Sequence, residues 1–307
     1  MNKIVAIQGN HPSKLNPLTD TSIFLANEIQ KKKYKIFYYE PKNLSIINSK
    51  VIAKGFFIKF DYNKKNFFKI YKNKKLDLSK CKFILIRQDP PFNLEYISTT
   101  YILNMLTKKV KIINHPTSIR NVSEKLFSAK YYKFMPKTIF TQNISEIKNF
   151  FKLHKKVILK PIHSFSGNDI HLLSKFNLRL IKNFIKKHDH IICQEYLPQI
   201  KKGDKRVFLI NGKVSGAISR VPKKGSFLSN MSKGARPKNT YLTKIEKKIS
   251  KIIAQDLKKE KIFFAGIDFI NQKLNGDINV TSPTGIKTFY DLSKKNLAKT
   301  FWNELKA

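Results

Sequence analysis

The sequence is poor in acidic residues, in arginine and in cysteine, and each shortage limits what the protein can be. Only 20 of its 307 residues are Asp or Glu, against 61 Lys or Arg, which gives a formal net charge of +41. An acid that stands among apolar residues in such a background needs an explanation. The two cysteines, Cys81 and Cys193, both lie between strand-like apolar residues. They provide neither a disulfide framework nor the ligand spacing of a zinc site, so we expect a reducing, cytoplasmic compartment.

Long apolar segments are also missing. No run of eighteen apolar residues occurs, so the sequence predicts no membrane-spanning helix. The N-terminal stretch turns polar soon after Ile7, which is too early for a signal peptide. Apolar residues at 41% and aromatic residues at 12% are nevertheless enough to exclude a disordered chain. A length of 307 residues predicts two or three packed subdomains rather than a single core.

The scarcity of arginine argues against a nucleic-acid-binding protein despite the charge. Arginine occurs only at positions 87, 120, 179, 206, 220 and 236, which leaves 61 − 6 = 55 lysines. Proteins that recognise phosphates and bases use the planar, bidentate guanidinium group far more often. The lysines are spread along the whole chain beside abundant Asn, Ile and Phe. We interpret them as a compositional bias on solvated faces, with weak attraction for polyanions and no specific nucleic-acid partner.

Strand-like and helix-like segments alternate along the chain, and this order predicts an α/β protein. We expect an N-terminal unit (1–120) with an open parallel sheet, a central unit (121–200), and a C-terminal unit (201–307) that includes a hairpin across Asn211-Gly212. The expected strands are 3–9, 35–39, a pair within 51–72, 83–87, 110–114, 157–161, 170–173, 191–196, 206–210 and 214–221. The expected helices are 19–32, 94–106, 121–132, 178–187, 242–257 and one from about 286.

A second hairpin near the end of the chain carries the most informative acids. Asp268 stands in an apolar stretch, and Asp277 and Asn279 follow after a polar turn expected at 271–276. Residues two apart in a strand share a face, so Asp277 and Asn279 point the same way, and the hairpin brings Asp268 beside them. Three oxygen ligands on one face suit a hard cation such as magnesium, bound together with phosphates. The alternative is a hairpin whose acids simply face water.

The stretch 222–239 is rich in Lys, Gly and Ser and interrupts the third unit. Its length is near the upper limit for loops that are neither functional nor disordered. Gly225 and Gly234 would suit the hinges of a lid. A passive linker is the alternative, but a linker does not explain why the stretch lies inside an apparent domain.

Seven blocks of the sequence resemble, in the same order, those of prokaryotic-type glutathione synthetases, which belong to the ATP-grasp superfamily. The blocks are Arg87-Gln88-Asp89-Pro90-Pro91-Phe92, Glu124-Lys125-Leu126-Phe127, Ile158-Leu159-Lys160-Pro161, Gln194-Glu195-Tyr196-Leu197-Pro198, Gly203-Asp204-Lys205-Arg206, Gly266-Ile267-Asp268 and Ile278-Asn279-Val280-Thr281-Ser282-Pro283-Thr284. The resemblance runs from residue 3 to about 300. The first and last blocks together are close to diagnostic of this family over other ATP-grasp ligases.

The resemblance implies an ADP-forming ligase that joins γ-glutamylcysteine to glycine through an acyl phosphate. Such chemistry depends on charge neutralisation and positioning more than on covalent help from the protein. The roles that the resemblance implies are as follows: Lys125 and Lys160 for the α- and β-phosphates; Gly167 in the loop covering the phosphates; Gln194, Glu195, Tyr196 and Leu197 for adenine; Asp204 for the ribose or loop ordering; Arg206 and Arg220 for the transferred phosphoryl group; Arg87, Asp89, Ser282 and Arg236 for substrate; and Asp268, Asp277 and Asn279 for two magnesium ions, with manganese possible.

The chain departs from the family pattern at three places. The loop 164–169 keeps only Gly167 of several glycines, the second metal-ligand position is Asp277 instead of glutamate, and Leu228 stands where the lid usually has an arginine. Two further readings therefore stay open: a ligase for a related γ-glutamyl substrate, and a weakly active ATP-binding paralogue. The resemblance also implies small-molecule substrates only, no membrane partner, and a homo-oligomer, by family analogy a tetramer.

Overall fold

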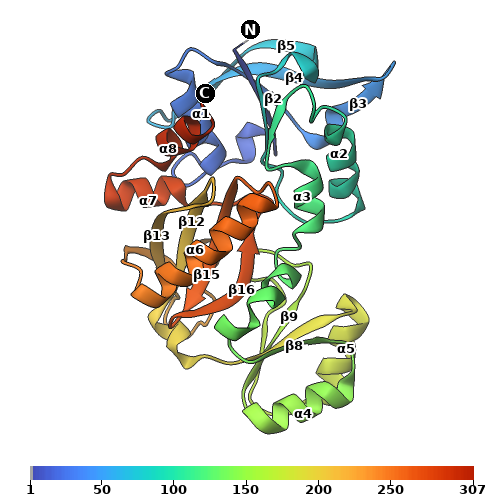
Figure 1. Cartoon of the computed structure of the whole chain (residues 1–307), viewed down its shortest axis with the longest axis vertical. Helices are drawn as coiled ribbons and strands as arrows, with labels where there is room; N and C mark the ends of the chain where they lie inside the picture. Colours follow the sequence, from blue (N-terminus) through green and yellow to red (C-terminus); the bar gives the residue numbers. More distant parts are fainter. Residues whose placement is uncertain (1–2) are drawn as a thin grey trace.

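The computed structural model describes residues 3–307, which form three β-sheets with helices packed on them (Figure 1). The first sheet has the order β3-β4-β2-β1-β6-β7, with β5 paired to β4. Its strands are β1 (Ile4–Gln8), β2 (Lys35–Tyr39), β3 (Leu44–Ile47), β4 (Lys50–Phe60), β5 (Phe68–Asp77), β6 (Phe83–Ile86) and β7 (Lys111–Ile113). Strands β2, β1, β6 and β7 are parallel, as the sequence predicts, whereas β3, β4 and β5 add antiparallel strands to one side. The expected open parallel sheet is therefore mixed.

The N-terminal sheet is covered by helices from both ends of the chain. Helices α1 (Thr21–Gln30) and α2 (Leu94–Asn104) follow strands of this sheet, and α1 is capped by Asp20, whose side chain accepts from the Ile23 N–H. The single helix expected from about 286 is two helices, α7 (Ile286–Ser293) and α8 (Leu297–Glu304). The indole N–H of Trp302 donates to the Leu25 carbonyl at 2.8 Å, so the C-terminal helices return to the first sheet (Figure 1).

The second sheet has the order β10-β9-β11-β8 and is antiparallel throughout. It contains β8 (Thr138–Thr141), β9 (Val157–Pro161), β10 (His171–Leu173) and β11 (Ile191–Glu195), with helices α4 (Ile144–His154) and α5 (Leu178–His188). No strand or helix is predicted from the sequence for 138–154. Strand β8 is half-buried at every position, so it lacks the alternation of buried and exposed residues that reveals an edge strand.

The predicted helix at 121–132 is wrong. Helix α3 (Pro116–Asn121) ends where it was expected to begin, and a 3₁₀ segment, η4 (Leu126–Phe134), follows after a break. Tertiary contacts account for the break, because the Ile278 N–H donates to the Glu124 carbonyl at 2.8 Å and draws this backbone to the third sheet. The break leaves Lys125 at the start of the 3₁₀ segment.

The third sheet lies between the other two in Figure 1 and has the order β14-β13-β12-β15-β16. Its strands are β12 (Asp204–Ile210), β13 (Lys213–Val221), β14 (Arg236–Asn239), β15 (Phe264–Ile270) and β16 (Lys273–Asn279), with α6 (Lys244–Lys259) on one face. The turn of the acidic hairpin was expected at 271–276 but consists only of Asn271-Gln272, so β16 begins earlier than predicted. The φ values of these two residues, 46° and 67°, give a tight turn that matches the strand twist. Strand β14 also occupies the end of the stretch expected to be a loop at 222–239.

None of the helices within residues 3–307 is long and apolar enough to cross a membrane. Both cysteines are buried and unpaired, Cys81 beside the first sheet and Cys193 within β11.

Candidate active site

A cavity of about 600 Å³ is lined by residues of all three units. The first unit contributes Asp20 and Asp89, the second contributes Lys160 and Gln194, and the third contributes a set of charged residues from adjacent strands. Most of the residues selected from the sequence line this one space: Asp89, Lys125, Lys160, Gly167, Gln194, Glu195, Tyr196, Leu197, Asp204, Arg206, Arg220, Asp268, Asp277, Asn279 and Ser282. Among these selected residues, Asp89 and Ser282 are 193 positions apart in the sequence and still line the same cavity.

Two predicted substrate residues, Arg87 and Arg236, do not line the cavity. The Arg87 side chain is buried, and its Nε donates to the Ser22 hydroxyl at 3.0 Å. Burial lowers the pKa of Arg87, and the nearby Asp20 and Asp89 carboxylates partly offset this effect. Arg236 begins β14, pairs with Val221 and has an exposed side chain. The exposed position arises because β14 joins the edge of the third sheet instead of remaining a loop.

Two buried arginine–carboxylate pairs cross the third sheet. The strand register places Arg206 opposite Asp268 and Asp204 opposite Arg220, so each pair is a cross-strand neighbour. Arg206 binds Asp268 through Nε–Oδ1 and Nη2–Oδ2, both at 2.7 Å, and Arg220 binds Asp204 in the same two-pronged way. Arg220 also reaches Asp268, with Nη2 3.0 Å from Oδ2. One charged network therefore joins four residues on three adjacent strands.

This network keeps Asp268 ionised. Burial alone would raise the pKa of its carboxyl, but the guanidinium groups of Arg206 and Arg220 outweigh burial and hold the pKa at about 2. The same carboxylates raise the pKa of Arg220 above its usual range, although burial acts in the opposite direction. At neutral pH the network thus presents two guanidinium groups and the ionised Asp268 carboxylate to the cavity, while burial raises the pKa of Asp204.

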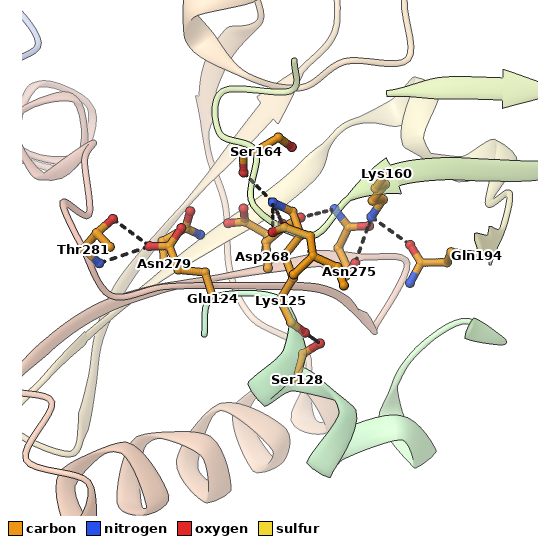
Figure 2. Close-up of polar contacts among 12 residues, drawn as sticks. Glu124, Lys125, Ser128, Lys160, Ser164, Gln194, Asp268, Asn275, Asn279 and Thr281 are labelled. Atoms are coloured by element: carbon orange, nitrogen blue, oxygen red, sulfur yellow. Dashed lines mark hydrogen bonds and ion pairs between the residues drawn. The ribbon is translucent and has the colours of Figure 1, made fainter. Parts of the chain in front are cut away.

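Two buried lysines, Lys125 and Lys160, also line the cavity, and Figure 2 shows their polar contacts. The Lys160 ammonium group donates to Gln194 Oε1 at 2.8 Å and to both oxygens of Asn275 at 3.1 Å. Lys125 donates to the Ser164 carbonyl at 2.5 Å and to the Ile162 carbonyl at 3.3 Å, and its Nζ lies 4.0 Å from Asp277 Oδ1. Burial lowers the pKa of Lys160, and Asp277 counteracts it. Cations held this way by neutral carbonyls are well prepared for an anionic ligand.

The hairpin residues suit a hard cation in their chemistry. Asp277 and Asn279 face the cavity while Ile278 between them is fully buried, which is the alternation predicted from the sequence. Asn279 donates through its amide nitrogen to the Gly266 carbonyl at 3.1 Å, so its side-chain oxygen is the group left to serve as a ligand. Two carboxylates and one amide oxygen are ligands that magnesium accepts. Within residues 3–307 no three His, Cys, Asp or Glu side chains gather around one point, so a cation here would need additional oxygens from a bound phosphate.

Glu124 is a site residue for which no role is predicted from the sequence. Its Oε1 accepts from the Val280 N–H at 2.9 Å, the Thr281 N–H at 3.0 Å and the Thr281 hydroxyl at 2.8 Å (Figure 2). These bonds fix the end of β16, and with it Asn279, to the segment that carries Lys125. The signal was present in the sequence, because Glu124 is one of few acids and lies next to an assigned lysine.

Comparison with known sequences assigns both parts of the chain. The domain described as "Prokaryotic glutathione synthetase, N-terminal domain" matches residues 4–120, and "Prokaryotic glutathione synthetase, ATP-grasp domain" matches residues 124–294. A glutathione synthetase of Agrobacterium fabrum is 35% identical, with 99% of this chain and 96% of that protein covered. One from Buchnera aphidicola subsp. Baizongia pistaciae is 38% identical, with 90% and 87% covered.

Comparison with solved structures identifies the fold. The D-alanyl-alanine synthetase A of Vibrio cholerae has a TM-score of 0.62 and 16% identity, with 100% of both chains covered. The D-cycloserine synthetase DcsG has a TM-score of 0.66 and 10% identity, with 98% of both chains covered. A complex of the ATP-grasp ligase PsnB with a minimal precursor, Mg and ADP has a TM-score of 0.61 and 11% identity, with 100% of this chain and 99% of that chain covered. The protein has the ATP-grasp fold, and by its sequence it belongs to the prokaryotic glutathione synthetase family.

Proposed function

We propose that this protein is a glutathione synthetase, a ligase that joins γ-glutamylcysteine to glycine and converts ATP to ADP and phosphate. The single observation that carries the proposal is the cavity itself, in which two lysines, two arginines and the hairpin carboxylates from separate units face one another. Family membership over nearly the whole chain supports the same reaction. We further propose that the units 1–120, 121–200 and 201–307 are domains, that they work as a cytoplasmic homo-oligomer, and that the ligands are small molecules.

We place the adenine of ATP at the end of the cavity formed by β9, β11 and the residues after β11. Ile158, Leu197, Ile200 and Ile270 give this end an apolar lining suited to a planar ring. The N–H groups of Glu195 and Tyr196 already donate to the Lys137 and Lys156 carbonyls, at 2.8 and 3.1 Å. A backbone hydrogen bond to adenine would therefore come from Leu197, the next N–H along the chain.

We place the phosphates between the lysines and the arginine network. Lys125 and Lys160 would exchange their carbonyl partners for phosphate oxygens, and Arg206 and Arg220 would face the transferred phosphoryl group. Gly167, whose φ of 71° suits glycine, would bring the backbone of the loop 164–169 over the phosphates. Asp268, Asp277 and Asn279 would hold magnesium, or manganese, which neutralises phosphate charge when bound.

The reaction follows from these positions. The cysteine carboxylate of the dipeptide attacks the γ-phosphorus, the bond to the β-phosphate oxygen breaks, and ADP leaves with that electron pair. The glycine amine then attacks the acyl phosphate, an amide bond forms, phosphate leaves, and the amine loses a proton. The arginines stabilise charge in both steps. Asp89 and Ser282 line the cavity on the side of the first unit, where we place the dipeptide, and the buried Arg87 lies near Asp89.

A coupled assay tests the proposal. We expect ADP release with γ-glutamylcysteine plus glycine, tripeptide in equal amount by mass spectrometry, and little ADP when glycine is omitted. Replacing the dipeptide by other γ-glutamyl compounds tests the alternative ligase, which the apolar Leu228 at the cavity would favour by removing a charge partner for the substrate. ADP release with such a compound alone, or with no dipeptide at all, would contradict the proposal.

A further inference from the structure

Ser229 differs from its neighbours in the stretch 222–239. Its side chain is buried at 7% exposure, whereas the residues on either side of it, Leu228 and Asn230, are half-buried. Its hydroxyl donates to Asp204 Oδ2 at 2.5 Å. Asp204 lies on β12, at the edge of the cavity and 25 residues away in sequence. A surface loop that inserts one hydroxyl onto a buried carboxylate has a specific anchor.

The anchor leads directly into the arginine network. The Asp204 oxygen that accepts from Ser229 also accepts from Arg220 Nη2. The same Nη2 lies 3.0 Å from Asp268 Oδ2. Two shared atoms therefore separate the loop from the carboxylate proposed to hold the metal.

The residues beside Ser229 touch the other loop of the cavity. A Cβ atom added to Gly167 would lie 2.5 Å from Asn230 Oδ1 and 3.6 Å from Leu228 Cδ2. The tip of the loop 164–169 is thus in close contact with the segment that Ser229 anchors. Ser229 is anchored to Asp204, while its neighbours Leu228 and Asn230 make the contact with the loop.

We propose that Ser229 is a positioning residue that latches the segment 226–232 closed over the cavity and joins this closure to the placement of Arg220. The proposal rests on the proposed function. When the segment opens, Asp204 loses the hydroxyl donor, and Arg220 becomes its remaining partner within the network. When the segment closes, the hydroxyl shares Asp204 with Arg220 and restores the arrangement that the reaction uses. A hydrogen bond from a hydroxyl to a buried carboxylate is strong enough to change the closed population about tenfold or more.

Limited proteolysis of the protein without ligands tests the latch independently of activity. Lys223, Lys224 and Lys233 are exposed sites for trypsin within the stretch. We expect the Ser229→Ala variant to be cut there about tenfold faster than wild type. The control is Ser45→Ala, which removes an exposed hydroxyl on β3, away from the cavity, and should be cut at the wild-type rate. Ser229→Thr keeps the hydroxyl and should restore part of the protection.

A second readout compares ADP release with tripeptide formation. We expect Ser229→Ala to release more ADP than it forms tripeptide, with a lower kcat and a smaller change in the KM for ATP. The Ser45→Ala control should keep the wild-type ratio of ADP to tripeptide. Equal trypsin cleavage of Ser229→Ala and wild type would overturn the latch even if ligation is normal. If wild type forms no glutathione, the proposed function fails, and the proteolysis result still decides the latch. A circular dichroism spectrum equal to wild type shows that the variant has folded.

Discussion

At the residue scale, the site depends on charged side chains that each have more than one role. Asp268 accepts two bonds from Arg206, contacts Arg220 and is also a proposed metal ligand. A metal cation that binds here must share the Asp268 carboxylate with these guanidinium groups or displace them from it. The arginines keep the carboxylate stable while no cation is bound, because an unpaired buried charge is costly.

The Asp268→Asn variant should lose turnover by at least about a hundredfold, mainly in kcat, because it removes charge at the site of phosphoryl transfer. Its free energy of unfolding without ligands should also be lower by about 3 kcal/mol, since Arg206 and Arg220 lose their anionic partner. Steady-state kinetics and denaturant unfolding measure the two effects. Asp291→Asn is the control, because Asp291 pairs with Lys287 on α7, away from the cavity. Near-normal ADP release by Asp268→Asn would contradict the assignment.

We expect Glu124 to act by holding the end of β16 in place and not by taking part in the reaction. Glu124→Ala leaves the Val280 and Thr281 N–H groups without their acceptor, which should cost about 1–3 kcal/mol of stability and raise the KM for ATP. Glu124→Gln keeps one carbonyl oxygen and should lose much less. Thermal unfolding and ATP titration of the two variants compare them. Equal losses of stability and of ATP affinity in both variants would mean that the negative charge of Glu124, and not its acceptor geometry, is what the protein needs.

The two thiols should not react while the protein is folded. Burial raises the pKa of Cys193 to about 12, and burial with a smaller effect of Asp77 raises that of Cys81 to about 12. Both therefore stay protonated at pH 8, and the thiolate is the reactive form. Titration with a thiol reagent at pH 8 should show no fast-reacting group before denaturant and two after it. A fast-reacting thiol in the native protein would contradict this expectation.

At the scale of elements, the loops between strands decide access to the cavity. The stretch 222–239 is only partly a loop, because β14 (Arg236–Asn239) pairs with β13. The part that can move without breaking the sheet is therefore 223–235. Phe227, Leu228, Ser229, Asn230, Met231 and Ser232 of this part line the cavity.

Replacing 223–235 by a Gly-Ser segment of equal length should leave ATP binding largely unchanged. Ligation should fall and ATP hydrolysis without tripeptide should rise, because an acyl phosphate must be kept from water until the amine attacks. ADP release measured against tripeptide formation gives the coupling ratio, and keeping β14 preserves the sheet. One-to-one coupling at the normal rate would show that the stretch is a passive linker.

At the scale of the whole molecule, most of the net charge of +41 comes from lysines that have no assigned role in the site. The lysines with assigned roles, Lys125 and Lys160, are buried, whereas many others, such as Lys223 and Lys233, are exposed. Mutual repulsion of exposed like charges destabilises the compact state and is reduced by salt.

Raising the salt concentration from about 0.02 to 0.2 M should therefore raise the thermal midpoint of unfolding, since the screening length falls to about 8 Å near physiological ionic strength. Catalysis should persist at the higher salt. Calorimetry and the coupled assay measure both, and binding to a DNA fragment serves as a comparison. A tight, sequence-dependent complex with nucleic acid at physiological salt would contradict the view that the lysine excess is compositional.

From the sequence alone, many of the strands and helices and most of the residues that line the cavity could be predicted. Strands such as 35–39 and 157–161 are read correctly because they are short apolar runs with clear ends. The alternation of Asp277, Ile278 and Asn279 follows from the two-residue period of any strand. Tertiary structure alone explains three other features: the break before Lys125, the turn at Asn271-Gln272 and the pairing of Arg206 with Asp268. The last pair is 62 residues apart, and its contact depends on the register of β12 against β15, which no local pattern specifies. The roles of Glu124 and Ser229 could not be predicted from the sequence either, because their hydrogen-bond partners belong to distant elements.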